Sequence, residues 1–249
     1  MFTILLLLIA GFLGGFIGAQ VGSGAMITLP ALLFLGVPPT LAIGTNMLPS
    51  WLINVVAFFK YLRSKKIIIE NQTASIAVVA FVGSLIGARL LLDIDKAILS
   101  KIVAFFFVAL IVLMFKKPAS SSEGAKKEIK QKYINIAAIL AFIVGIYGGF
   151  FTVAVTTFFI FILVYLLGRN LLEAAAESVF IVSIVLSIAL LVFIKTDNID
   201  YHFAIPLTVG SIIGSWVGAA AALKFGEKWI KVLMAITIII VILKLLIGF

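Results

Sequence analysis

The 249-residue sequence has no cysteine and a single histidine, His202. The first absence excludes disulfides, thiolate metal sites and cysteine nucleophiles, and the second leaves little for a metal centre. Charged residues make up only 12% of the chain, against about 25% in ordinary soluble domains, whereas apolar residues make up 64%. This composition excludes a water-soluble monomer. The first 59 residues also lack Lys and Arg, so the N-terminus is predicted to be a retained membrane segment and not a cleavable signal peptide.

The net charge of +9 does not indicate a nucleic-acid partner, because the basic residues gather in the breaks between apolar runs. Neither nucleotide-binding motifs nor HExxH and GxSxG motifs are present. The sequence therefore predicts no cofactor and no metal. An intramembrane enzyme remains only as a less favoured alternative.

Apolar runs between the charged, Pro and Gly breaks predict membrane-spanning helices, since a span needs roughly 20 apolar residues. The predicted segments are 1–35, 39–59, 72–92, 98–115, 133–167, 171–194, 203–223 and 229–249. Segments 1–35 and 133–167 are 35 residues long, which as straight helix would be about 52 Å against a core of about 30 Å. Each must therefore tilt strongly, break or double back.

Each long segment has a break signal near its middle. In the first it is Gly18–Gly24 (GAQVGSG), and in the second it is Thr152–Thr157 (TVAVTT). Glycine lowers helix propensity and Ser or Thr can cap a new helix start, so the pattern predicts a helix, a turn and a second helix. The alternative for Gly14, Gly18 and Gly22 is a packing face of small residues spaced by four.

The linker 116–132 is charged and Ser-rich, and it separates a first repeat, 1–115, from a second, 133–249. Positive charge in this linker and in the loop after residue 59 predicts that both are cytoplasmic and that both termini are extracytoplasmic, in a multi-pass protein of the cell membrane. The repeats are seen in three superpositions: Gly36–Ile67 over Gly168–Ile199, Gly11–Phe16 over Gly145–Phe150, and Gly83–Ala88 over Gly214–Ala219.

The basic loop of the first repeat and the acidic loop 195–202 of the second then lie on opposite sides of the membrane, so the repeats are inverted. The predicted fold is an all-α polytopic membrane protein in which each repeat is a broken, re-entrant helical hairpin followed by three transmembrane helices. Such inverted repeats with broken helices are typical of secondary transporters, whose substrate site lies near the midplane where the breaks meet.

The sequence resembles the sulfite exporter TauE/SafE family, also called TSUP transporters. The resemblance rests on GFLGGFIGAQVGSGAMITLPALLFLGVPPTLAIGTNML and FFKYLRSKKI in the first half, and on GIYGGFF, LGRNLLEAAAES and LKFGEKWIKVLMAITIIIVILKLL in the second. It implies a carrier for small sulfur-containing anions such as sulfite, thiosulfate or organosulfonates. The family usually has a Gly-Pro-Gly type turn after GGFF, where this chain has Thr152–Thr157, whose hydroxyls can donate hydrogen bonds instead.

If each hairpin restarts at its tip, with Ser23 and Thr156 or Thr157 as caps, two positive helix ends point at a midplane anion site. A packing turn without a ligand is the alternative. Asn46, Ser50 and Asn54 form one polar stripe on a helix, and interhelical hydrogen bonding is the alternative for Ser50 and Asn54. The predicted substrate-binding residues are Gln20, Gly22, Ser23, Gly24, Thr45, Asn46, Thr152, Thr156, Thr157 and Ser178.

Glu177 occupies the position equivalent to Thr45, inside a predicted span, where an acidic group is functional by default. It is predicted to carry a coupling proton; the alternative is that it reaches the cytoplasmic interface beside Arg169 and Glu173. The predicted function is a secondary transporter, specifically an exporter, that moves a small anionic substrate across the lipid bilayer by alternating access. An anion channel is the alternative. The sequence leaves a homodimer open.

Overall fold

The fold is a bundle of helices. The computed structural model of the protein describes residues 2–22, 24–65, 69–93 and 131–247. The elements in these ranges are α1 (Phe2–Val21), α2 (Ala25–Phe34), α3 (Pro39–Arg63), α4 (Asn71–Asp93), α6 (Gln131–Phe150), α7 (Val155–Leu167), α8 (Leu171–Lys195) and α9 (Tyr201–Ile247). Six of these helices are long and apolar enough to cross a membrane. The predicted all-α polytopic membrane protein is confirmed for this part of the chain. The predicted segment 98–115 and the linker up to residue 130 lie outside the described residues.

Local sequence sets the helix boundaries. Pro39 occupies the first turn of α3. The N–H groups of a first turn have no partner within the helix, so the missing N–H of proline costs no hydrogen bond there. At α8 the Asn170 side chain accepts a hydrogen bond from the Glu173 N–H at 2.8 Å, and the Glu173 carboxylate accepts one from the Asn170 N–H at 3.1 Å. This capping box lets α8 start at Leu171, shortly after α7 ends at Leu167.

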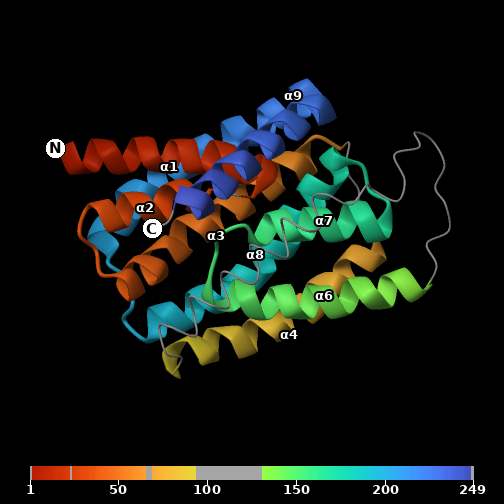
Figure 1. Cartoon of the computed structure of the whole chain (residues 1–249), viewed down its shortest axis with the longest axis horizontal. Coiled ribbons are helices and arrows are strands. Elements are labelled where there is room, and N and C mark those ends of the chain that lie inside the picture. The colour runs from red at the N-terminus through yellow and green to blue at the C-terminus, as the bar shows by residue number, and fades with distance from the viewer. Residues whose placement is uncertain (1, 23, 66–68, 94–130, 248–249) are drawn as a thin grey trace.

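Both long apolar segments are broken, as predicted. The first break lies between Val21 and Ala25, and the second between Phe150 and Val155. The second parts, α2 and α7, have 10 and 13 residues, or about 15 and 20 Å of helix, and are too short to cross a core of about 30 Å. In Figure 1 each runs back toward the end of the bundle from which its hairpin starts.

The bundle has two ends that are held by different contacts. At one end, which we call the Arg169 end, the turn between α7 and α8 meets the start of α4, and Arg169 pairs with Glu70 at 2.7 Å. At the other, the Asp200 end, the start of α3 meets the loop before α9, and the Asp200 N–H donates to Thr45 Oγ1 at 2.9 Å. The two hairpins start from opposite ends: α1 from the Asp200 end and α6 from the Arg169 end (Figure 1).

Corresponding hydrogen bonds join α4 to α8 and α9 to α3. Ser84 Oγ donates to the Val185 carbonyl at 2.7 Å, and Ser215 Oγ donates to the Ile53 carbonyl at 2.6 Å. Ser84 lies over Ser215, and Ile53 over Val185, in two of the superpositions predicted from the sequence. Each bond therefore joins the residues equivalent to those joined by the other bond. The same interhelical contact is made twice, once with each half as donor.

The third predicted superposition, Gly11–Phe16 over Gly145–Phe150, is wrong by one helical turn. A Cβ on Gly18 would lie 3.0 Å from Ile53, and a Cβ on Gly148 would lie 3.0 Å from Val185, the counterpart of Ile53. Gly18 therefore corresponds to Gly148, where the sequence alignment had Gly14. Glycines recur every four residues in this helix, so a slip of one turn still matches glycine to glycine and the sequence alone does not detect it.

Glycines in the Gly83/Gly87 and Gly210/Gly214/Gly218 rows also bring the outer helices into backbone contact. A Cβ on Gly214 would lie 2.0 Å from the Phe12 carbonyl oxygen of α1, and one on Gly87 would lie 1.9 Å from the Ile146 carbonyl oxygen of α6. Each hairpin thus packs its first helix against a helix of the other half. This is the close approach that small residues permit between membrane helices.

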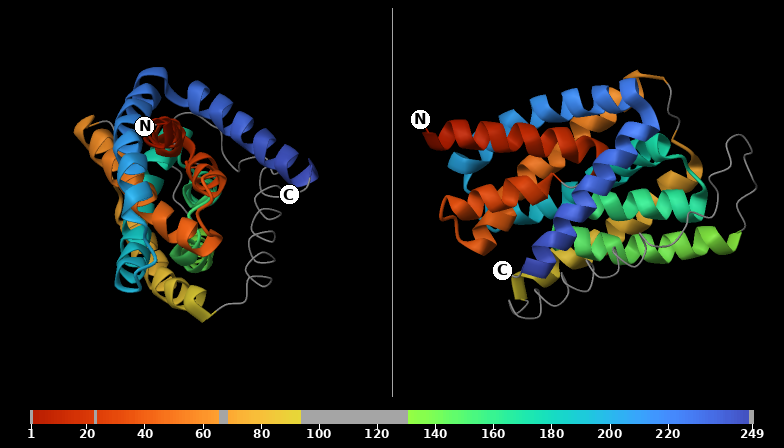
Figure 2. Two further views of the ribbon diagram at one scale, coloured as in Figure 1. Left: turned by 90° about the vertical axis from the view of Figure 1, so that its left-hand side faces the viewer. Right: turned by 45° about the horizontal axis from the view of Figure 1, so that its top comes forward.

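The last two predicted spans, 203–223 and 229–249, are joined without a loop in α9. Gly226 has φ 71° and ψ −159°, a non-helical conformation that breaks the axis there. The part of α9 after this break runs at a steep angle to the first part (Figure 2). Its side chains Ile230 and Met234 are buried, so this part still contacts the bundle.

Candidate functional site

The two hairpin breaks touch each other inside the bundle. Gly22 has φ +78°, and a Cβ placed on it would lie only 2.1 Å from the Thr156 Cβ. The Thr157 hydroxyl donates to the Val21 carbonyl at 2.5 Å. Only glycine fits at position 22, both for its backbone conformation and for this close approach.

The polar stripe of α3 binds the second break. Asn46 Nδ2 donates to Thr152 Oγ1 at 3.0 Å, and Thr156 Oγ1 donates to Asn54 Oδ1 at 3.2 Å. Between them, Ser50 accepts from Asn46 Nδ2 through its hydroxyl at 3.1 Å and from Asn54 Nδ2 through its carbonyl at 2.8 Å. All three stripe side chains are buried. The stripe therefore faces the interior, as its spacing predicts.

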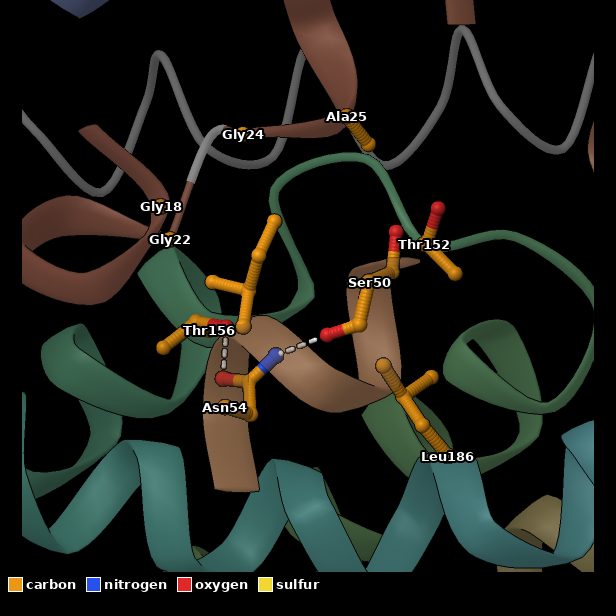
Figure 3. A pocket seen from close by; sticks show the side chains of 10 residues that line it. Gly18, Gly22, Gly24, Ala25, Ser50, Asn54, Thr152, Thr156 and Leu186 are labelled. Atoms are coloured by element: carbon orange, nitrogen blue, oxygen red, sulfur yellow. Dashed lines mark hydrogen bonds between the residues drawn. The ribbon is translucent and has the colours of Figure 1, made fainter. Parts of the chain in front are cut away.

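A small cavity lies where the breaks and the stripe meet (Figure 3). It offers about 10 Å³ to the centre of a water molecule, which is room for about one water. One wall is polar, with Thr152 from the second break and Thr156 from the first turn of α7, and another is the apolar Leu186 of α8. The lining residues are Gly18, Gly22, Gly24, Ala25, Ser50, Ile53, Asn54, Thr152, Thr156 and Leu186. An oxyanion of sulfur is larger than a water, so its entry requires the lining to move.

Two helix N-termini begin at this cavity without a side-chain cap. The N-cap residues are Gly24 for α2 and Ala154, with φ +61°, for α7, and neither helix has a side-chain cap hydrogen bond. The prediction that Thr156 or Thr157 caps α7 is wrong, because the helix starts at Val155 and both threonines lie in its first turn. An uncapped N-terminus presents N–H groups and a partial positive charge, which attract an anion.

Four of the predicted substrate-binding residues line the cavity: Gly22, Gly24, Thr152 and Thr156. Two more touch it indirectly, since Asn46 donates to Thr152 and Thr157 donates to Val21, beside Gly22. Ser23 lies outside the described residues.

The other three predicted residues are engaged elsewhere. The Gln20 side chain accepts from Trp229 Nε1 at 2.7 Å, and Ser178 Oγ donates to the Ala175 carbonyl at 2.8 Å. Thr45 accepts from Asp200 at the Asp200 end. None of the three lines the cavity.

The predicted site set left out six of the lining residues. Ser50 and Asn54 are on the polar stripe, whose spacing already indicated them, but interhelical bonding was an equal alternative there. Ile53 and Leu186 are apolar and have no chemical signal in the sequence. Gly18 and Ala25 come to the cavity only because of where the first break falls.

Glu177 belongs to a separate cluster. Its side chain is 2% exposed, pairs with Arg169 at 2.9 Å and accepts a hydrogen bond from the Thr73 hydroxyl. It does not line the cavity, and it precedes Leu186 by nine residues of α8, which is about 13.5 Å of helix.

Arg169 is the centre of this cluster. Burial by itself lowers the pKa of the guanidinium, but the hydrogen bonds and charges of Glu70 and Glu177 outweigh this and raise the pKa. Arg169 therefore stays charged, and it bridges the two carboxylates. No group of three or more His, Cys, Asp or Glu side chains that could hold a metal ion occurs among the described residues.

Helices long and apolar enough to span a membrane, two half-length helices that begin inside the bundle and an interior polar cavity define a class: polytopic membrane transport proteins. A family profile described as "Sulfite exporter TauE/SafE" matches residues 7–245. The chain therefore belongs to the TauE/SafE sulfite exporter family.

The relatives are named as transporters. The chain is 30% identical over 233 residues to a "Probable membrane transporter protein" of Haemophilus influenzae, covering 93% of this chain and 89% of that one. It is 28% identical to YfcA of Escherichia coli K12, covering 96% and 88%, and 22% identical to YunE of Bacillus subtilis, covering 96% of both. Both carry the same description. No solved structure shows a significant match.

Proposed function

We propose that this protein is a secondary transporter that exports small sulfur-containing anions, such as sulfite, thiosulfate or organosulfonates, by alternating access at the interior cavity. The observation that carries the proposal is the meeting of two uncapped helix N-termini, α2 and α7, beside the polar stripe of α3. Each terminus contributes at most about 2 kcal/mol to holding an anion, so N–H groups and hydroxyls must act together to replace its hydration.

The substrate class follows from the name of the family. In this proposal Gly22, Ser23 and Gly24 let the backbone approach the anion, and the Thr152 and Thr156 hydroxyls turn toward it. Asn46 and Thr157 orient those groups through the bonds described above. Gln20 and Thr45 connect α1 to α9 and α3 to the loop before α9, and Ser178 bonds within its own helix turn.

The halves act as inverted repeats in this mechanism. The Arg169 end is cytoplasmic, together with the linker 116–132, and both termini are extracytoplasmic. The inversion is supported by the two hairpins, which start from opposite ends of the bundle. The orientation is supported by exposed Lys224 and Lys228, which lie beside Glu227, and Glu227 bonds to Leu171 at the Arg169 end.

Glu177 is the proposed site of the coupling proton. Protonation would remove the negative charge that pairs with Arg169 and accepts from Thr73, so it would change the contacts of α8 with α4 and with the α7–α8 turn. Glu177→Gln should therefore remove the pH dependence of transport in proteoliposomes. An unchanged pH profile would exclude Glu177 from coupling.

Counterflow in proteoliposomes tests the function. Vesicles loaded with unlabelled sulfite, thiosulfate, sulfate, sulfoacetate, taurine or a simple carboxylate are diluted into a trace of the labelled compound. A carrier for sulfur anions accumulates label transiently against internal sulfite, thiosulfate or a sulfonate. Conduction without this stimulation would indicate a channel, an altered product an enzyme, and exchange of carboxylates alone would overturn the sulfur assignment.

A matched pair of variants ties the activity to the cavity. Thr156→Val keeps the shape of the side chain but removes the hydroxyl that lines the cavity, so exchange should fall at least tenfold, the effect of about 1.4 kcal/mol. Ser187→Ala removes a hydroxyl that donates to the Ile184 carbonyl in its own helix turn and does not line the cavity, and exchange should be unchanged. Equal rates in the two variants would contradict the proposed site.

A further inference from the structure

An ion-pair cluster joins three elements at the Arg169 end. Arg169, directly after the C-cap of α7, pairs with Glu70 before α4 at 2.7 Å and with Glu177 of α8 at 2.9 Å. Thr73 of α4 donates to the same Glu177 carboxylate. The Arg169 side chain is 10% exposed and that of Glu177 is 2% exposed, so these charges are largely removed from water. Separation of such a pair leaves a buried charge without its partner.

The other end of the bundle lacks this ionic contact at the corresponding positions. The repeat alignment places Arg169 over Val37 and Glu177 over Thr45. Val37 is buried in a small apolar cluster with Leu7 and Leu32, and Thr45 makes a neutral hydrogen bond with the Asp200 N–H. The same packing framework is thus held by ion pairs at one end and by apolar and neutral contacts at the other.

Two further contacts close the Arg169 end across the break in α9. Glu227, directly after Gly226, accepts from the Leu171 N–H at 2.8 Å, and Trp229 donates to Gln20 at the end of α1 at 2.7 Å. One short stretch of α9 therefore bonds both to the end of α1 and to the start of α8. If the cavity opens toward this end, the α7–α8 turn must leave the start of α4, and the Arg169–Glu70 pair must separate.

We propose that the Glu70–Arg169–Glu177 cluster is a gate that holds the substrate cavity closed toward the Arg169 end. This inference rests on the proposed function, because it needs a cavity that opens alternately to the two sides. In the gate, Arg169 is a positioning residue that contacts no substrate. Loss of Arg169 or Glu70 shifts the protein toward the state open at this end.

The absence of cysteine in the sequence makes the test specific. Leu186→Cys introduces a single thiol into the cavity wall. Its reaction with a membrane-impermeant maleimide is measured separately from each face, in right-side-out and inside-out vesicles. The same reporter is then combined with Glu70→Gln, with Arg169→Gln and with both. Lys228→Gln serves as the charge control, since Lys228 is exposed at the same end.

If the cluster is a gate, Arg169→Gln and Glu70→Gln should each raise the rate at which the Leu186→Cys thiol is labelled from the Arg169 end by about tenfold. This is the change that about 1.4 kcal/mol produces. The double variant should exceed Arg169→Gln by less than twofold, because both remove the same contact. Lys228→Gln should leave the rate unchanged. Rates that do not change in either gate variant, or that rise equally for Lys228→Gln, would overturn the gate.

Protection separates this result from the proposed function. Sulfoacetate should slow labelling of the Leu186→Cys thiol if the cavity binds the substrate; it is the probe because sulfite and thiosulfate react with the maleimide themselves. Protection by sulfoacetate with no change in the gate variants refutes the gate alone, whereas absence of protection refutes the proposed site. Arg169→Lys keeps the charge, so it should reverse at least half of the rise in labelling rate seen in Arg169→Gln. If it does not, and the detergent-solubilised variant elutes as the unaltered protein does, the gate is also contradicted.

Discussion

Replacing Gly22 by alanine is the most direct test of the contact between the two hairpin breaks. The added Cβ would lie 2.1 Å from the Thr156 Cβ and 2.7 Å from the Thr157 nitrogen. Carbon atoms in ordinary contact are about 3.5–4.0 Å apart, so the two breaks would have to separate by about 1.5 Å. Gly36→Ala is a matched control, because Gly36 has nearly the same φ, +80°, but nothing within 4 Å of the added Cβ.

The two variants share the penalty of a non-glycine residue in the left-handed region, about 1–2 kcal/mol. Gly22→Ala must also strain or break the Thr157–Val21 hydrogen bond, 2.5 Å long, and the bond from Thr156 to Asn54. Each is worth about 1 kcal/mol, and lost packing adds to this. We expect a total of about 3–5 kcal/mol for Gly22→Ala and about 1–2 kcal/mol for Gly36→Ala.

Thermal unfolding of the purified protein in detergent, followed by tryptophan fluorescence, measures the difference. For a chain of this length about 2–4 °C corresponds to 1 kcal/mol, so Gly36→Ala should lower the apparent Tm by about 2–8 °C and Gly22→Ala by about 6–20 °C. Counterflow should be lost in Gly22→Ala and kept in Gly36→Ala. If the two variants have the same apparent Tm and the same exchange, the breaks do not meet as described and the cavity between them is not the site.

Three further outcomes are expected in the same unfolding assay. Ser84→Ala and Ser215→Ala should each lower stability by about 1 kcal/mol, because they remove equivalent hydrogen bonds, and a loss in only one of them would contradict the repeated contact. Arg169→Gln leaves the Glu177 carboxylate buried without its cation and should lower stability by about 3–5 kcal/mol; a neutral effect would show that the pair is not formed. Trp229→Phe should lower stability by about 1 kcal/mol through the lost bond to Gln20, without changing which anion is exchanged.

Segment length and residue spacing were enough to predict much of this fold. Two apolar runs too long for one span predicted the breaks, and polar residues four apart on α3 predicted an interior stripe. These are properties of the membrane thickness and of the helix period, so they are readable without a structure. The residue-by-residue alignment of α1 with α6 was not readable in this way, because glycines that recur every four residues fit two registers.

Contacts between distant parts of the chain could not be predicted in the same way. Nothing in the local sequence around Glu70 indicates that it pairs with Arg169, because the contact depends on how two turns from different halves meet. The cap of α7 was also misplaced: the sequence favours a threonine, whereas the helix starts one residue after Ala154 in a left-handed conformation. Tertiary packing at the meeting point of the breaks selects that start over the local capping preference.

The polar stripe of α3 has no equal in the other half, since Asn46, Ser50 and Asn54 correspond to Ser178, Val182 and Leu186. The two halves supply matching sets of helices, but only α3 carries this row of polar side chains. Under the proposed function, changes in selectivity between related chains should therefore accumulate on α3 and the tip of the second hairpin. The matching face of α8 is free to diverge among apolar side chains, as long as it fills the same space.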